Sequence, residues 1–141
     1  MANQVPNHFK YLLATKAIDF DNDSFIIILM ESGFVFDKDA DALYADVSGD
    51  ELPTANGYTI KTKALANVTV TEDDVNDRCN IVADAVSWTA TDGAIGPCPG
   101  AIIIDDTVAD DPIVGYIDFG AEYTQASGGT VTINNIAIRI S

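Results

Sequence analysis

Aspartates at alternate positions are the residues of this chain whose types and spacing come closest to a known chemistry. Asp37, Asp39 and Asp41 fit the first, third and fifth positions of a helix–loop–helix calcium loop, where carboxylate oxygens bind the ion. The pattern then fails. The sharp-turn glycine position holds Ala42, and the position of the bidentate glutamate holds Ser48. This stretch therefore lacks the complete calcium motif.

A second run of aspartates, Asp19, Asp21 and Asp23, repeats both the match and its failure, because Ser24 and Met30 stand where glycine and glutamate are needed. A third acidic group, Asp105-Asp106 with Asp110-Asp111, could converge on a cation without any motif. Aspartate is also a common turn former. We therefore expect all three groups to be solvated turns, with no metal site and no cofactor.

Groups that could catalyse a reaction are scarce. His8 is the single histidine, so a Ser–His–Asp or Cys–His arrangement would have to use it. The chain contains no Gly-x-Ser-x-Gly elbow and no glycine-rich phosphate loop. Paired carboxylates can hydrolyse glycosides, but among 22 Asp and Glu residues a pair at a suitable distance is expected by chance. The sequence predicts that the protein is not an enzyme.

Three aromatic residues, Trp88, Tyr116 and Tyr123, could together form a platform on which a sugar ring stacks. A single tryptophan in a strand more often packs in a core or an interface. Burial is therefore the expectation for Trp88, and a carbohydrate-binding β-sandwich module stays open as an alternative function.

The charge of the chain excludes one class of partner. Seven Lys and Arg stand against 22 Asp and Glu, which gives a formal net charge of −15. Such a surface repels phosphate backbones, so we expect no nucleic-acid partner. The cations are also unevenly placed: after Arg78 the only one is Arg139. If a surface meets a partner through charge, the patch on the partner should therefore be basic, or a divalent cation should lie between the two.

The start of the chain and its two cysteines give no sign of secretion. The chain shows no charged-then-apolar signal segment at its start, and the apolar run 25–30 is too short to cross a membrane. We therefore expect no membrane partner and synthesis in a cytoplasm. Cys79 and Cys98 form no C-x-x-C pair, and we expect both thiols to be free.

Two strand-like runs, 100–104 and 113–119, are the elements around which the rest should be organised. Both are rich in β-branched and aromatic residues, and the acidic segment 105–112 between them ends in proline. They predict two antiparallel strands joined by an acidic loop. Trp88, Tyr116, Ile117 and Phe119 are expected in the core with Phe25, Ile27, Leu29 and Ile103.

The remaining elements complete a mainly β domain that covers residues 1–141. We expect an extended arm over 1–7, a short amphipathic helix over 8–18 and a strand buried on both faces over 24–30. Further strands are expected at 58–64, 67–71, 79–86 and around Trp88, and over 130–140 with a bend at Asn134-Asn135. Strands about ten residues apart with regular turns predict a jelly-roll-like antiparallel β-sandwich.

Several segments, taken in order, resemble small virion proteins of tailed bacteriophages, of the capsid-decoration or cement type. The segments are HFKYLL, GFVFDKDA, NGYTIKTKALANVTVTEDDVND, SWTA, GAIGPCPGAIIIDDT and GYIDFG, followed by a short β C-terminus. The similarity covers most of the chain, from His8 to Ile140. The resemblance is a pattern of strands and turns without a catalytic signature. It implies a jelly-roll-like sandwich that forms homo-oligomers, commonly trimers, on the outer capsid surface.

The resemblance implies that the major capsid protein is the partner and that the protein resides on the outside of the virion. Another virion component, such as a tail, fibre or head–tail adaptor protein, is an alternative. We expect the capsid or intersubunit contact at Phe9, Lys10, Tyr11 and Lys16, because this segment supplies aromatic and basic groups that the acidic second half lacks.

Overall fold

The computed structural model describes residues 2–141, apart from the side chain of Ala2, and the fold of this part is mainly β. The predicted antiparallel β architecture with a short N-terminal helix is confirmed. In chain order the elements are β1 (Ala2–Gln4), α1 (Asn7–Ala14), β2 (Phe25–Leu29), α2 (Tyr44–Val47), the 3-10 helix η1 (Ser48–Asp50), β3 (Lys63–Ala64), β4 (Thr69–Asp73), β5 (Arg78–Ala83), β6 (Val86–Thr89), β7 (Ile95–Asp105), β8 (Ile113–Gln125), β9 (Thr130–Ile133) and β10 (Ile136–Ile140).

One long antiparallel hairpin, formed by residues 78–140, is the framework of the molecule. Its two arms pair along almost their whole length, because β5 pairs with β10, β6 with β9 and β7 with β8. The predicted hairpin around the acidic loop is the closed end of this structure, where Ile104 lies opposite Ile113. At the open end Cys79 lies opposite Ile140.

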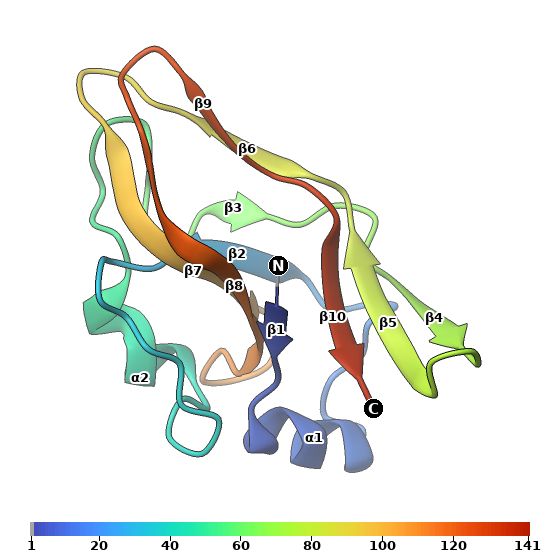
Figure 1. Cartoon of the computed structure of the whole chain (residues 1–141). Helices are drawn as coiled ribbons and strands as arrows, with labels where there is room; N and C mark the ends of the chain where they lie inside the picture. The colour runs from blue at the N-terminus through green and yellow to red at the C-terminus, as the bar shows by residue number, and fades with distance from the viewer. Residues whose placement is uncertain (1) are drawn as a thin grey trace.

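The long hairpin folds back on itself and thereby builds two layers (Figure 1). Its closed end joins a five-stranded sheet with the order β1-β8-β7-β2-β3, and its open end forms a three-stranded sheet with the order β10-β5-β4. The pair β6-β9 connects the two ends. Asn135 has a left-handed φ of 53° between β9 and β10, which accounts for the bend predicted at Asn134-Asn135.

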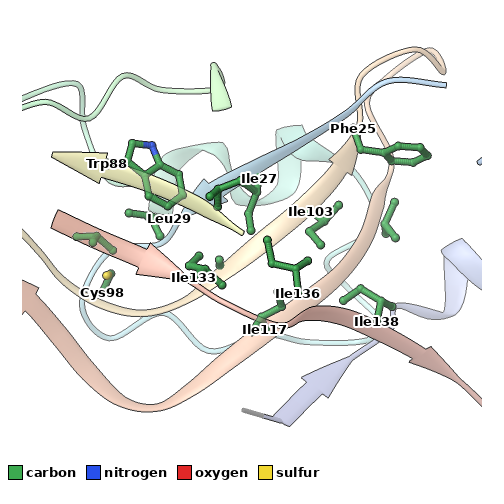
Figure 2. Packing of buried hydrophobic residues seen from close by; sticks show 14 of the residues in the cluster. Phe25, Ile27, Leu29, Trp88, Cys98, Ile103, Ile117, Ile133, Ile136 and Ile138 are labelled. Carbon is green, nitrogen blue, oxygen red and sulfur yellow. The ribbon is translucent and has the colours of Figure 1, made fainter. Parts of the chain in front are cut away.

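The main hydrophobic core lies between the two layers (Figure 2). Ile27, Ile103 and Ile117 of the five-stranded sheet face Ile136 and Ile138 of the opposite layer. In β10 the buried positions alternate with more exposed ones, as in a strand with one face on a core. Of the residues expected in the core, seven are buried and Phe119 is partly buried.

A second core covers the other face of the five-stranded sheet and explains why β2 is apolar throughout. The segment between β2 and η1 folds over this face and places Phe36 and Val47 against Ile28 and Ile104. The ring of Phe36 stacks on Tyr116 with a centroid distance of 5.4 Å. All five residues of β2 are therefore buried, and the predicted strand with two buried faces is confirmed.

The helix predicted over 8–18 ends earlier than expected. The N–H of Ala17 bonds to the carbonyl of Leu12 at 2.9 Å, and the N–H of Lys16 bonds to that of Leu13 at 3.1 Å. Lys16 has a φ of 60°, so this is a Schellman ending with lysine at the left-handed position that glycine usually occupies. Without a glycine at this position, no local signal marks the end of the helix.

Two other segments also differ from their expected form. The strand predicted over 58–64 forms only at Lys63–Ala64, because Lys61 has a left-handed φ of 51° and interrupts the extended backbone. In the segment expected as an extended arm, Ala2–Gln4 is extended but pairs with β8 as the outer strand of the sheet. Met1 lies outside the described residues.

Candidate functional site

Both runs of alternating aspartates fold into the same hydrogen-bonded turn. In the first, the Asp19 carboxylate accepts the N–H of Asp21 at 3.0 Å, and the Asp23 carboxylate accepts the N–H of Asp19 at 2.9 Å. In the second, Asp37 and Asp41 repeat these bonds at 2.9 and 2.8 Å. The shared spacing is therefore explained by local turn formation. Within residues 2–141, no three His, Cys, Asp or Glu side chains gather closely enough to hold a metal ion.

Asp105 is the exception among the acidic loop residues, because its side chain is completely buried. Its Oδ1 atom accepts the N–H groups of Thr107 at 2.9 Å and Val108 at 3.2 Å. Its Oδ2 atom has no hydrogen-bond partner in the described part of the chain. Burial, and then the neighbouring Asp23 carboxyl, raise the pKa of Asp105 to about 6. Sequence reasoning missed this residue because burial of one aspartate in a cluster leaves no local pattern.

A buried polar network ties the loop between β2 and β3 to the five-stranded sheet. One oxygen of Glu51 accepts the hydroxyl of Tyr58 at 2.7 Å, and the other accepts that of Tyr44 at 2.6 Å. The Tyr58 hydroxyl also accepts the N–H of Leu29 at 3.0 Å. Burial and Glu51 raise the pKa of both phenols, that of Tyr44 to about 12. Both phenols are therefore neutral donors, and the network serves to fix the loop.

The other groups with catalytic potential stay apart from one another. His8 lies on α1 and stacks on Tyr11 with ring centroids 6.0 Å apart. Neither cysteine is in a disulfide; Cys98 is buried, and burial raises the pKa of its thiol to about 11. No side-chain hydrogen bond within residues 2–141 joins His8 to a serine, cysteine or carboxylate.

The aromatic platform suggested by the sequence does not form. Trp88 and Tyr116 are buried, in different cores on opposite faces of the five-stranded sheet. Trp88 packs against Tyr58, with ring centroids 5.9 Å apart, and Lys63 lies over its ring at 5.4 Å. Only Tyr123 of the three is exposed. These residues therefore cannot stack on a sugar together.

The surface of helix α1 is where the structure places most of the predicted contact residues. Lys10 and Tyr11 are exposed on the helix, and Lys16 is exposed in the turn that ends it. We call these three residues the α1 patch. The side chain of Tyr11 is 62% exposed although it is large and apolar. Neither lysine forms an ion pair with another residue of the 2–141 segment.

The prediction that Phe9 contacts a partner is wrong. Its side chain is completely buried and meets the ring of Phe20 edge-on at 6.1 Å. Phe9 therefore anchors α1 to the core and cannot contact a partner. A single helical turn does not reveal which aromatic residue faces inward, and for this reason the sequence placed Phe9 and Tyr11 on the same surface.

Sequence reasoning also missed Lys38 as a neighbour of the patch. The carbonyl of Lys38 accepts the N–H of Asn7, the first residue of α1, at 3.0 Å. A third exposed lysine therefore belongs to the same end of the molecule as the α1 patch. The two segments are distant in sequence, so no local signal could have joined them.

None of the helices in the described part of the chain is long and apolar enough to cross a membrane. Comparison of the chain with protein-family models, with curated proteins and with solved structures finds no match.

Proposed function

We propose that this protein is a structural component of a tailed-bacteriophage virion, of the capsid-decoration type. It binds the major capsid protein on the outer surface of the shell and stabilises the shell. We propose that it does so as a homo-oligomer, a trimer. It is made in the host cytoplasm and acts without catalysis. The support is the resemblance of the sequence together with a surface suited to binding.

The observation that carries the proposal is the α1 patch. The chain has a net charge of −15, yet Lys10 and Lys16 are exposed and free of ion pairs with residues 2–141, beside an exposed tyrosine. Tyrosine contributes a large contact area at low entropic cost, and unpaired lysines can meet acidic groups of a partner. A decoration protein needs such contact surfaces and no active site.

The exposed acidic turns are a second feature that fits the same proposal. Asp74, Asp106 and Asp110 are exposed at the turns of two hairpins. Like charges on the outside of decorated particles repel one another and keep the particles dispersed. This role requires the acidic turns to remain in solvent while the α1 patch is bound to the shell.

The experiment that tests the proposal is co-sedimentation of the purified protein with undecorated shells. The double variant Lys10→Gln/Lys16→Gln should bind the shells more weakly than the wild type. Adding Tyr11→Ala to it should weaken binding further. A matched control, Ala45→Glu/Ala85→Glu, changes the net charge equally at two exposed positions outside the patch. It should bind like the wild type. Equal binding by all variants would remove the α1 patch from the contact.

The oligomeric state and the location in the virion are tested separately. Light scattering should give a mass close to three times the chain mass of 15.0 kDa. In purified particles a decoration protein should be present in many copies over the whole shell. A few copies at one vertex would instead assign the protein to the tail, a fibre or the head–tail adaptor.

A further inference from the structure

A groove of about 460 Å³ opens where strands β8 and β9 separate. The two strands are joined by a tight turn but pair with different partners, β7 and β6, so they diverge after the turn (Figure 1). Phe119, Ala121 and Tyr123 line one wall, and Val131, Thr132 and Ile133 line the other. The groove is therefore bordered by two strands and contains mainly apolar surface.

Both walls of the groove are strand edges without a neighbouring strand. The strand β1 pairs with β8 only as far as Asp118, where Ala2 lies opposite. Beyond this point no strand of the 2–141 segment pairs with the outer edge of β8. Among the described residues, the strand β9 pairs with β6 alone. The N–H of Gly120 bonds to the Asp118 carboxylate at 2.8 Å, and the remaining backbone N–H and C=O groups of the two edges are those to which an extended chain can bond.

These edges also lack the residues with which proteins usually protect an open edge. Lysine and proline are the common protective residues, and neither occurs in residues 119–125 or 130–135. The side chain of Tyr123 is 44% exposed at the groove, and its hydroxyl donates to Gln125 at 2.7 Å. An unprotected apolar edge in a soluble domain is a site for strand addition.

The charge around the groove indicates which kind of segment can bind there. Glu122 is the only charged residue that lines the groove, and it is held by Ser32 and the N–H of Gly33 at 2.7 and 2.8 Å. The lining of the groove holds this carboxylate and no Lys or Arg, and the chain has a net charge of −15, so a cationic segment is attracted to the groove. We propose that the β8–β9 groove binds an extended segment of a partner protein that alternates apolar and basic residues.

Such a segment would place its apolar side chains against the groove and its Lys or Arg side chains toward solvent and Glu122, because successive side chains of a strand point to opposite faces. The inference rests on the proposed function only for the identity of the partner, which would be the major capsid protein. The groove would then be a second contact beside the α1 patch.

The test uses a blocked peptide of alternating valine and lysine, with a valine–glutamate peptide as its control. Titration into the full-length protein should shift the amide NMR signals of residues 119–125 and 130–133, and the valine–glutamate peptide should leave them unchanged. The variants Ala121→Lys and Thr132→Lys, one on each wall and both at exposed positions, should each lower the affinity about tenfold or more. Ala45→Lys, on the exposed surface of α2, is the matched control and should bind like the wild type.

Absence of shifts in the groove, equal binding of both peptides, or equal affinity of all three variants would overturn the inference. Concentration-dependent shifts of the same residues without peptide would show that a second copy is the occupant, which also overturns it. Binding to undecorated shells distinguishes the failure of the groove assignment from the failure of the decoration role. If Ala121→Lys binds shells like the wild type, the groove is not a shell contact although the decoration role stands. If wild-type protein ignores shells but binds the peptide, the decoration role fails and the groove assignment stands.

Discussion

Replacing Asp105 by asparagine should stabilise the protein at neutral pH and remove one source of pH dependence. The buried carboxyl has a pKa of about 6 because burial and the Asp23 carboxyl disfavour its charge. In the unfolded chain an aspartate titrates near pH 4. Between these values the folded state binds more protons than the unfolded state, so stability falls as pH rises. A difference of about two pKa units corresponds to about 3 kcal/mol lost by pH 8.

Asparagine keeps the acceptor for the N–H groups of Thr107 and Val108 and can donate from Nδ2 to Asp23, so it imitates the protonated acid. Urea unfolding followed by tryptophan fluorescence should show Asp105→Asn more stable than the wild type by up to about 3 kcal/mol at pH 8. The advantage should shrink below pH 6 and vanish near pH 4.

Asp110→Asn is the matched control for this prediction, because it removes one charge at an exposed position of the same loop. Asparagine tolerates the left-handed φ of 67° at that position. The reasoning is refuted if Asp105→Asn is no more stable than Asp110→Asn at pH 8. It is also refuted if its advantage is the same at pH 4 and pH 8, because a gain from packing alone would not depend on protonation.

Three further predictions concern the core, the polar network and the acidic turns. Trp88→Ala should cost about 3–5 kcal/mol in urea unfolding, because the indole is buried against Tyr58, and a cost near zero would contradict its place in the core. Tyr58→Phe should cost about 1–3 kcal/mol, since Glu51 and the buried N–H of Leu29 each lose a partner, whereas Tyr11→Phe on the exposed helix should have almost no effect. Thermal melts with chelator and with millimolar Ca²⁺ should coincide, and a saturable rise in melting temperature with Ca²⁺ would show that the aspartate turns bind the ion.

The strands around the acidic loop were predictable because their information is local. The runs 100–104 and 113–119 are separated by a short turn-forming segment, so their pairing follows from sequence alone. The burial of β2 on both faces was equally readable, since a strand without polar positions has no face to expose to water. Nothing local shows that the hairpin continues to Cys79 and Ile140 and folds back into a second layer.

The interaction surfaces were less predictable because they depend on how distant segments meet. The sequence indicated Lys10, Tyr11 and Lys16 correctly as surface residues, but Phe9 faces the core. The choice between the two aromatic residues is made by packing against Phe20, which comes after the helix. The β8–β9 groove exists because the two strands pair in different sheets, and pairing between distant segments is not encoded in either strand alone.

The most direct test of the proposed function is saturation binding of the purified protein to undecorated shells, with the melting temperature of the shells measured at each point. The account predicts saturation at many copies spread over the shell and a higher shell melting temperature, because a ligand that binds only the assembled state stabilises it. A protein that stays in solution beside intact shells, or that binds without raising their melting temperature, would contradict it.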